Sequence, residues 1–468
     1  MVQKSWKAFI TSALLAGSSV AIALPFNSFD PRSMAMGGAG VAVGDAKIAP
    51  FFNPALLTVT REDDDFSLAL PIIGVRAYDP EKFATSLDDF QKNDYVGQMD
   101  TAISNYNLAQ TSTNLNAIST NASTLSTQFT TLSDKPIQAE FGAGFVIGIP
   151  SKSFGMALYG NGWGAVGGII KYRDDQTLQN FISMSNTVAN TISTSCAGTV
   201  NNSAGCVSAL LAMPITDTNP NPLITTNEFF TIDASVATPN VTSNFNSNNL
   251  QSSVDIRGVV LSEAGFALSH EFNLMGSDFG VGITPKVVRA MLLDYTADVN
   301  NGSTGNATDS DFTAKYTTVN FDLGLAKDYA NGWRTGFVIK NVIPHKLDFK
   351  RAPVLGVGAT PQPTGDTVSL RPQARVGVSH SNSWSTAALD VDLTANDPAG
   401  FENKSQYVAL GGELNAWDIA QLRVGYRADL KNSNRSVASA GIGLGPFDLA
   451  VSGSANEVGA SASFGFTF

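Results

Sequence analysis

The sequence predicts an all-β protein, a transmembrane antiparallel β-barrel of about 14 strands with an N-terminal hatch in the lumen and a helical extracellular insert. The first observation is the C-terminal stretch 458–468, where every second residue is apolar and the chain stops on Phe468. A period of two is typical of a strand with one apolar face. The second observation is that similar segments recur along the chain. The third is that the connections between them alternate in length, as they do in outer-membrane barrels.

Residues 1–23 are predicted to be a secretory signal peptide, so the mature chain begins near Leu24. Lys4 and Lys7 precede a largely apolar run, and Ala21-Ile22-Ala23 fits the small-residue cleavage pattern. The alternative is a transmembrane anchor, but the run is shorter than the ~20 residues that a spanning helix needs.

The charge of the chain argues against nucleic acid as a partner. Charged residues make up only 15% of the sequence, and the formal net charge is −11. Nucleic-acid phosphates would repel so acidic a chain. An exported, weakly charged protein with no second long apolar run is either a secreted soluble protein or a membrane barrel, and the alternating segments favour the barrel.

Residues 24–64 are predicted to form the hatch. The run 37–44 is rich in glycine and other small residues, and Asn53-Pro54-Ala55 follows it. A phosphate-cradling loop is the alternative, but no strand precedes the glycines and no P-loop lysine follows them. Small residues at this density suit close backbone packing in a narrow space. Asn53 and Pro54 suit a helix start, since Asn is a good N-cap and Pro is tolerated in the first turn.

Residues 65–468 are predicted to form the barrel, and its strand count is even, as in bacterial barrels. The predicted strands are 65–77, 138–149, 154–172, 254–271, 278–297, 312–329, 333–346, 371–380, 384–394, 404–415, 420–430, 436–445, 447–454 and 458–468. Short turns such as 150–153 alternate with long connections such as 80–134 and 173–253. If the C-terminus lies in the periplasm, the long connections lie outside the cell.

Charged residues share one face of these strands with glycine, and a charge on the lipid face costs about 2–4 kcal/mol. We therefore predict a polar lumen face. Its members are Glu263, Asp322, Arg375, Asp390, Asp392, Glu413, Arg423 and Arg427. Paired carboxylates could also serve acid/base chemistry or bind calcium, but salt bridges that hold a plug are the favoured interpretation. In the barrel-closing strand, Phe464, Phe466 and Phe468 are predicted to face lipid.

Two long connections carry further signals. Residues 80–134 are predicted to be a helical outer loop, with an apolar seam that includes Leu115, Ile118, Leu125 and Phe129. The favoured interpretation is a lid on the barrel rim, and the alternative is an outward hairpin that docks a partner.

The second long connection, residues 173–253, is predicted to be an Asn/Ser/Thr-rich outer loop with a helix at 176–193, and its composition suggests little burial. Cys196 and Cys206, the only cysteines, are predicted to form a disulfide in this exported chain.

The hatch run resembles a known family. Residues 32–42 (RSMAMGGAGVA) followed by Asn53-Pro54-Ala55 resemble the N-terminal hatch of FadL-like outer-membrane barrels, and most closely the members labelled conjugal transfer protein TraF. The helical insert after the first strand, Gly282–Lys286 and Lys340–Pro344 add to the resemblance, which covers most of the mature chain. The thioredoxin-like protein that shares the TraF name has a different architecture and does not match.

The resemblance implies a fourteen-stranded barrel plugged by its own N-terminus. It also implies a hatch and ligand region made of Met36, Gly37, Gly38, Phe51, Phe52, Asn53, Pro54 and Ala55. Uptake of apolar small molecules is the implied activity. The resemblance identifies no ligand pocket.

Two functions remain open. The first is passage or binding of hydrophobic small molecules, and the alternative is a protein-binding platform in conjugal transfer or secretion. The sequence lacks a G-x-S-x-G motif and its three histidines lie far apart, so we predict no enzyme, no metal and no cofactor. An apolar pocket beside Asn53 would favour transport. A lumen packed by charged pairs, with an exposed helical seam, would favour the platform.

The predicted location is the outer membrane of a Gram-negative cell, with both termini in the periplasm. The expected partners are outer-membrane lipid and lipopolysaccharide, the barrel-assembly machinery, hydrophobic small molecules, and conjugation or secretion proteins.

Overall fold

The structure is a computed structural model that describes residues 22–23, 29–58, 65–213, 221–274, 276–298, 312–351, 362–416 and 420–468. Apart from Ile22 and Ala23, the predicted signal peptide lies outside the described residues. Parts of the predicted hatch, 24–28 and 59–64, lie outside them too. Ile22–Ala23 is strand β1, which pairs in parallel with β16 (Ala395–Asn396).

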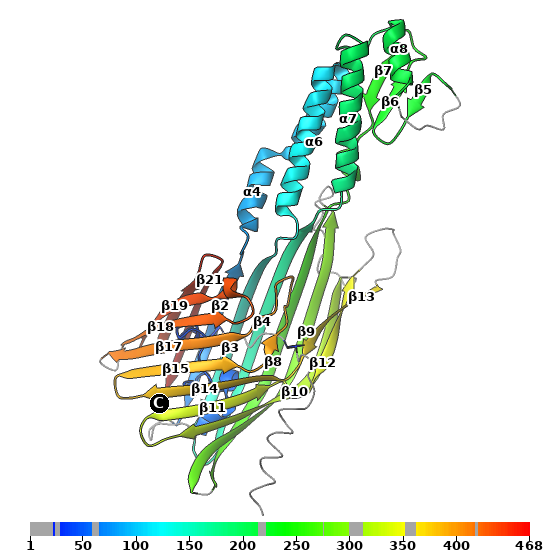
Figure 1. Cartoon of the computed structure of the whole chain (residues 1–468). Coiled ribbons are helices and arrows are strands. Elements are labelled where there is room, and N and C mark those ends of the chain that lie inside the picture. The colour runs from blue at the N-terminus through cyan, green and yellow to red at the C-terminus, as the bar shows by residue number, and fades with distance from the viewer. Residues whose placement is uncertain are drawn as a thin grey trace, which may run out of the picture.

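Fourteen antiparallel strands close into a barrel (Figure 1). They are β2 (Ser67–Tyr78), β3 (Ile137–Ile149), β4 (Gly155–Lys171), β8 (Ser253–Leu274), β9 (Ser277–Asp298), β10 (Thr313–Asp328), β11 (Trp333–Lys340), β14 (Gln373–Ser381), β15 (Ser385–Asp392), β17 (Tyr407–Ala416), β18 (Ala420–Asp429), β19 (Val437–Leu444), β20 (Phe447–Gly453) and β21 (Glu457–Thr467). Each strand pairs with its neighbours in chain order. The predicted fold, including the strand number, is confirmed.

The last strand closes the barrel against the first. β21 pairs with β2, and beyond the ladder the Phe468 N–H donates to the Phe66 carbonyl at 3.0 Å. The register of β2 shifts between Ala69 and Ile72, around Pro71, which has no N–H for the ladder. Ser461 is buried, whereas 64% of Phe468 is exposed on the outer side.

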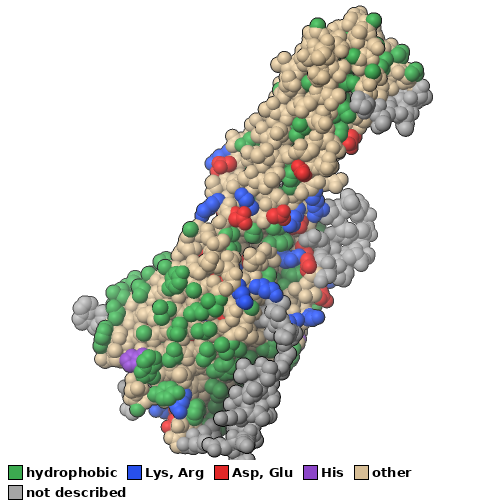
Figure 2. Space-filling model, in the orientation of Figure 1, with side chains coloured by type: hydrophobic (Ala, Val, Ile, Leu, Met, Phe, Trp, Pro, Cys, Tyr) green, Lys and Arg blue, Asp and Glu red, His purple; other side chains and the backbone are tan. Residues whose placement is uncertain are grey.

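The barrel exterior is apolar. Large hydrophobic side chains point outward from most strands, and Val319, Val424 and Val451 are each at least 60% exposed. Green hydrophobic side chains cover the visible barrel wall in Figure 2, with few charges among them. A membrane barrel needs such a belt against lipid. Among the described residues, no helix is both long and apolar enough to cross a membrane.

One predicted strand is shorter than expected. The segment 333–346 ends as a barrel strand at Lys340, because Asn341 adopts a left-handed φ of 55° and breaks the extended backbone. The chain then enters β12 (His345–Arg351), which forms a hairpin with β13 (Gln362–Leu370). Leu347 and Phe349 are buried against the inner face of the barrel wall, so the predicted long connection carries a hairpin.

Two long connections rise from one end of the barrel as a single projection, here called the stalk (Figure 1). It comprises α4 (Phe83–Asn93), α5 (Tyr95–Leu108), α6 (Ser112–Leu132), α7 (Asp175–Ser195), α8 (Ala204–Leu211), β5 (Ile224–Thr226), β6 (Phe230–Asp233), β7 (Asn240–Ser243) and the 3-10 helix η2 (Ser247–Asn249). The C-terminus lies at the opposite end of the barrel, where the short turns are.

The stalk has its own hydrophobic core. The apolar seam of α6 packs on α7, so Leu115 and Phe129 bury against side chains such as Phe181. The seam is therefore neither a lid on the barrel rim nor an exposed docking face. The expectation that residues 173–253 bury little is wrong, because Phe230 and Val241 are fully buried in this core.

Candidate functional site: the plugged lumen

The hatch begins with a capped helix inside the barrel. Helix α2 (Pro31–Ala35) starts after Asp30, whose carboxylate accepts a hydrogen bond from the Ser33 N–H at 2.7 Å. Burial raises the pKa of Asp30 to about 6. The helix ends at Ala35, and after its C-cap Met36 come Gly37 and Gly38, whose φ angles of 72° and 96° favour glycine. These two residues turn the chain across the lumen.

The hatch helix fits the wall because the wall has glycine where the two meet. A β-carbon on Gly425 would lie 2.2 Å from the Gly37 nitrogen, and one on Gly441 would lie 2.5 Å from the Ala35 Cβ. A β-carbon on Gly411 would lie 2.5 Å from the Cβ of Met36. Side chains at these positions would push the hatch off the wall. Glycines in successive strands thus form its seat.

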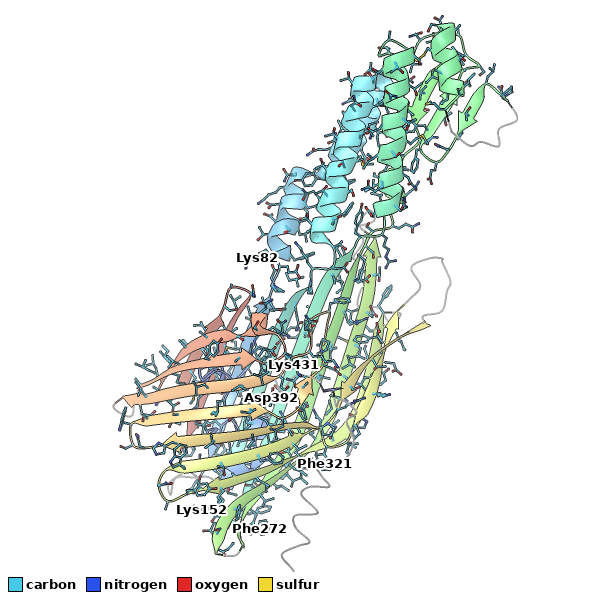
Figure 3. All side chains as sticks on the ribbon, in the orientation of Figure 1. Lys82, Lys152, Phe272, Phe321, Asp392 and Lys431 are labelled. Atoms are coloured by element: carbon cyan, nitrogen blue, oxygen red, sulfur yellow. A yellow bond between two sulfur atoms is a disulfide. The ribbon has the colours of Figure 1, made fainter. Side chains whose placement is uncertain are left out.

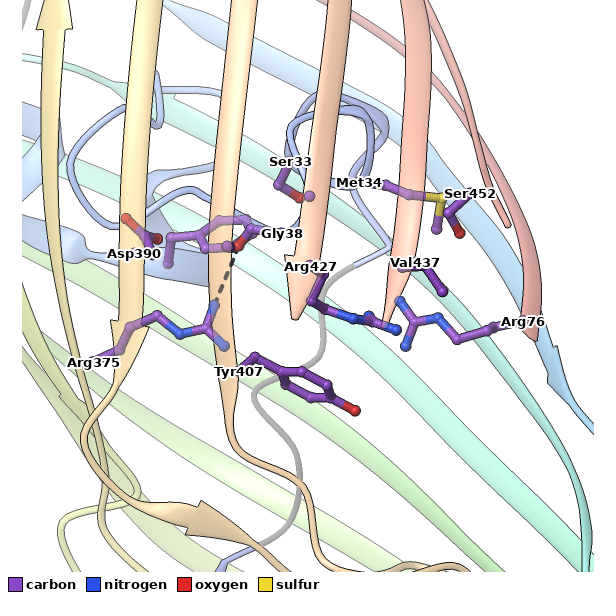
Figure 4. Close-up of a pocket in the computed structure, with 13 residues that line it drawn as sticks. Ser33, Met34, Gly38, Arg76, Arg375, Asp390, Tyr407, Arg427, Val437 and Ser452 are labelled. Carbon is purple, nitrogen blue, oxygen red and sulfur yellow. Dashed lines mark hydrogen bonds between the residues drawn. The ribbon is translucent and has the colours of Figure 1, made fainter. Parts of the chain in front are cut away.

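Charged wall residues then hold the hatch backbone (Figure 4). Asp390 of β15 accepts hydrogen bonds from the N–H groups of Gly40 and Val41 at 2.8 and 2.9 Å. Arg375 of β14 donates to the Gly38 carbonyl at 3.3 Å and also to Asp392 at 2.6 Å. Hydrogen bonds to a charged partner are the strong ones, so the contacts of Asp390 and Arg375 with the hatch backbone anchor the hatch, and Asp392 orients Arg375.

The second half of the hatch, α3 (Ala49–Phe52) and the 3-10 helix η1 (Pro54–Thr58), is held on the other wall. Asn53 donates to the carbonyls of Val41 and Leu325 at 3.0 and 2.9 Å, which links hatch to barrel. Asn53 also accepts from the Ala55 N–H at 3.1 Å. Lys340 donates to the Phe51 carbonyl at 2.9 Å.

Ion pairs fill the lumen beside the hatch. Lys286 lies 3.0 Å from both Glu263 and Asp322. Arg32 of the hatch binds Glu413 of the wall at 2.9 and 3.0 Å, a two-pronged contact. The opposite charges at Arg32 raise its pKa although burial acts in the other direction. The carboxylates of Glu263, Asp322 and Glu413 are therefore partners in lumen salt bridges, which is the favoured interpretation of the sequence analysis.

Arg423 binds the same Glu413 from the wall at 2.7 Å and also contacts Asp448. Glu413 is therefore shared between a hatch arginine and a wall arginine. The hatch and barrel are joined in one charged network.

A second network, of which the sequence prediction included only Arg427, closes the lumen toward the stalk. Arg76 lies 2.9 Å from Glu140 and 3.2 Å from Glu457. Arg427 contacts Glu457, and Arg435 lies 3.2 Å from Glu140. The parity rule that identified Arg427 also applies to Arg76, Glu140 and Glu457, but Arg435 lies in a loop helix that no periodicity marks.

The eight predicted lumen residues therefore fall into separate groups. Glu263 and Asp322 meet at Lys286, whereas Arg375, Asp390 and Asp392 gather around the glycine turn of the hatch. The remaining predicted residues, Glu413, Arg423 and Arg427, belong to the two networks above. Phe468 is exposed on the outer side of β21, whereas Phe464 and Phe466 are partly buried and border the hollow at the turn end of the lumen that Arg32 and Glu413 also line. Among the described residues, no cluster of His, Cys, Asp and Glu could hold a metal ion.

The cavity beside the glycine turn of the hatch is small. The cavity that Gly37, Gly38 and Phe52 line together with Arg375 and Asp390 measures about 40 Å³. Such a volume holds one or a few waters and no drug-sized ligand, because ligand pockets measure roughly 300–1,000 Å³. At the turn end, a polar hollow of about 640 Å³ opens beside Arg32. The predicted ligand region is thus packed.

The disulfide lies far from this site, in the stalk. Cys196 at the end of α7 is bonded to Cys206 in α8 across ten positions of sequence. Both cysteines are buried in the stalk core. The bond clamps the tip of the stalk.

Comparison with known proteins gave two kinds of match. The family model described as F plasmid transfer operon, TraF, protein matches residues 50–392. Among solved structures, the chain is similar to the toluene transporter TbuX of Ralstonia pickettii, with 13% identity and a TM-score of 0.46 over 95% of this chain and 99% of that chain. It is also similar to the toluene transporter TodX of Pseudomonas putida, with 11% identity and a TM-score of 0.41 over 96% of this chain and 100% of that chain. No curated protein matches.

Proposed function

Because the chain belongs to the TraF protein family of the F plasmid transfer operon, we propose that it is a plugged outer-membrane barrel that presents its stalk as a protein-docking platform. The stalk would stand outside the cell, with both chain termini in the periplasm. The family match supports a setting in conjugal transfer, and the stalk and the hatch support the docking role.

The observation that carries the proposal is a self-contained stalk on a packed barrel. The stalk buries most of its seam in a core of its own, and its base packs on the barrel rim through Phe83 and Leu132, which contact Ile170. The lumen below it holds a hatch fixed by Asp390, Arg375 and Asn53. A rigid projection on a closed support suits docking better than passage.

The stalk surface suits contact through hydrogen bonds. Exposed threonines follow the outer side of α6, among them Thr120 and Thr127, seven residues apart on one helix face. Figure 2 shows an upper stalk with few charged side chains, most of which gather near the barrel. The expected partner is therefore a protein with an uncharged, polar surface.

The test places charge on that surface. Thr120→Arg with Thr127→Arg should leave the stalk folded, because substitutions at exposed positions usually change stability by less than 0.5 kcal/mol. Conjugation frequency in cells whose only copy carries both changes should fall at least tenfold. Ser383→Arg, in an exposed turn at the opposite end of the barrel, is the matched control. Normal mating by the stalk variant would contradict the platform.

A second function, passage of hydrophobic small molecules, has one observation in its favour. Above the hatch, the inner wall is apolar, with Trp163, Val259 and Leu261 buried beside Phe349 of the β12–β13 hairpin. An apolar lining could receive an apolar solute if the hairpin moved aside.

Uptake separates the two functions. Cells that express the chain would take up labelled toluene faster than cells with an empty vector if passage is the role. Equal uptake would rule out passage, and it would leave the mating result as an independent test of the platform.

A further inference from the structure

The polar hollow of about 640 Å³ at the turn end of the lumen, here called the turn-end hollow, lies between the hatch and the wall. The hatch contributes Arg32, Asp45 and Lys47 to its lining, and strands β17, β18 and β21 contribute the wall side. Its volume falls within the range of ligand pockets, roughly 300–1,000 Å³. Because charged and amide side chains line it, the hollow suits a polar occupant better than an apolar solute.

The wall beside the hollow is notched, because two neighbouring strands end at different heights. β20 begins at Phe447, which pairs with Phe464 of β21, whereas β21 continues to Thr467. The Gly465 N–H still donates to the Pro446 carbonyl at 2.8 Å, in the turn that precedes β20. Among the described residues, β21 beyond this contact is paired only with β2. The end of β21 therefore has a free edge beside the hollow.

The register shows which backbone groups lie at this edge. Phe468 and Phe66 exchange two hydrogen bonds, since each N–H donates to the carbonyl of the other, at 3.0 and 2.7 Å. Hydrogen-bonded and non-hydrogen-bonded pairs alternate along an antiparallel ladder. The next pair, Thr467 and Ser67, is therefore not hydrogen-bonded, and the N–H and carbonyl of Thr467 point away from β2, toward the hollow that Thr467 lines. Such an edge is a template for an added strand.

Three side chains of the lining have unused hydrogen-bond donors. Within the described part of the chain, the side-chain amides of Asn415 and Gln421 form no hydrogen bond, although both residues are partly buried. The Lys47 ammonium lies 3.9 Å from Asp45, which is beyond hydrogen-bond distance. Because the unused groups of these side chains and of the Thr467 N–H are donors, the hollow suits an occupant that is rich in acceptors, such as peptide carbonyls and a carboxylate.

The charges of the lining identify Lys47 as the cation that is available to a ligand. Glu413 binds both Arg32 and Arg423, so these two arginines are already engaged. Asp45 lies 3.4 Å from Arg32, closer than its 3.9 Å contact with Lys47. A carboxylate that enters the hollow can therefore bind Lys47 without breaking the ion pairs that join the hatch to the wall. Charged hydrogen bonds of this kind are the strong ones.

We propose that the turn-end hollow binds an extended, acidic peptide segment of a periplasmic protein. The backbone of the segment pairs with Thr467 at the free edge of β21, and a carboxylate side chain binds Lys47. The bound segment contacts the hatch and the wall at once, so it would stabilise the plugged state. The periplasmic source rests on the same orientation as the proposed function, with the stalk outside the cell. Peptide binding itself does not depend on the docking role of the stalk.

The test uses a phage-displayed library of random seven-residue peptides and the full chain in detergent micelles. The library is first depleted on Asn415→Trp, whose indole fills the hollow, so that peptides that bind elsewhere are removed. Selection on the native chain should then enrich peptides that carry Asp or Glu at one position.

Fluorescence anisotropy of the strongest selected peptide, labelled with fluorescein, tests the charge. Lys47→Gln should weaken its binding about tenfold, because it removes a charged hydrogen bond. Lys152→Gln is the matched control, in an exposed turn at the same end of the barrel (Figure 3), and should bind like the native chain. No enrichment of acidic peptides, or equal binding by the Lys47 variant, would overturn the proposal.

A second pair of variants tests the strand edge. Thr467→Pro removes an N–H that the ladder with β2 does not use, so the barrel should stay closed while peptide binding weakens about fivefold. Thr467→Val keeps the N–H and should bind like the native chain. Heat-modifiable migration on gels confirms that each variant is folded. Equal binding by the proline variant would exclude strand addition. Binding that appears only with Glu62→Ser, Asp63→Ser and Asp64→Ser would assign the hollow to the chain's own acidic run and would also contradict the proposal.

Discussion

At the scale of single residues, glycine and charge decide where the hatch lies. Gly425 leaves room for the backbone of Gly37, and Asp390 holds the two N–H groups that follow the glycine turn. The sequence identified Asp390 as a lumen residue from strand parity. It could not identify the partner, because Gly40 lies 350 residues away in the chain.

Gly425→Ala is expected to displace the hatch. Its β-carbon would lie 2.2 Å from the Gly37 nitrogen and 2.3 Å from the Met36 carbonyl carbon, and neither backbone atom can swing aside. Single-channel recordings in planar bilayers should show conductance steps in this variant. The native barrel should be silent.

Gly412→Ala is the matched control. Its β-carbon would meet only a Val424 methyl at 4.0 Å, an ordinary contact. Silent recordings from both variants would show that the glycine seat does not position the hatch.

Asp30→Asn is expected to remove a pH dependence of stability. Burial raises the pKa of Asp30 from 3.8 to about 6; the Ser33 N–H and Arg423 act against this rise, and Asp448 and Asp45 add to it. Since the folded pKa exceeds the unfolded one, the free energy of unfolding falls as the pH rises from about 4 to 6. A shift of about two pKa units corresponds to about 3 kcal/mol.

Asparagine can cap the helix without a charge. Thermal unfolding in micelles should therefore show Asp30→Asn more stable than the native chain at pH 7 and equal to it at pH 4. The same difference at both pH values would argue against a titrating Asp30.

At the scale of elements, periodicity predicted where the strands and helices lie in the sequence. It did not predict which elements pack together. The alternation of apolar and small residues over 458–468 is a local property of the chain. The predicted strand therefore matches β21 in the structure. The heptad-like spacing of α6 was also correct as a helix signal. Its partner is α7, which a barrel hairpin separates from α6 in sequence. An apolar seam predicts that a helix buries one face. It does not predict which element packs on that face.

Cys196→Ser with Cys206→Ser is expected to loosen the stalk tip and leave the barrel intact. A closed loop of about ten residues contributes roughly 3 kcal/mol in the chain-entropy model. Limited proteolysis should cut the variant near residues 196–206 much faster than the native chain. Because the stalk core is separate from the lumen, heat-modifiable migration should stay unchanged. Loss of that migration would mean that the stalk and barrel fold together.

At the scale of the whole molecule, the fold combines a lipid-facing barrel, a bound hatch and a rigid stalk. The apolar exterior needs a membrane, and the charged lumen needs the hatch to complete its contacts. The full chain should therefore fractionate with the outer membrane and migrate faster on gels before heating than after. Recovery as a soluble periplasmic protein would contradict the fold and both proposed functions.

The sequence by itself determined the strand number and the polar face, because period two and connection length are local properties of the chain. Tertiary structure alone decided that the hatch packs against the wall and that the α6 seam is covered by α7. Both depend on residues far apart in the chain: Arg32 and Glu413 are separated by 381 positions, and α7 begins more than 40 residues after α6 ends. The terminal strand shows this division: its alternation predicted a closing strand, and only the closed barrel paired it with β2, at the other end of the barrel sequence.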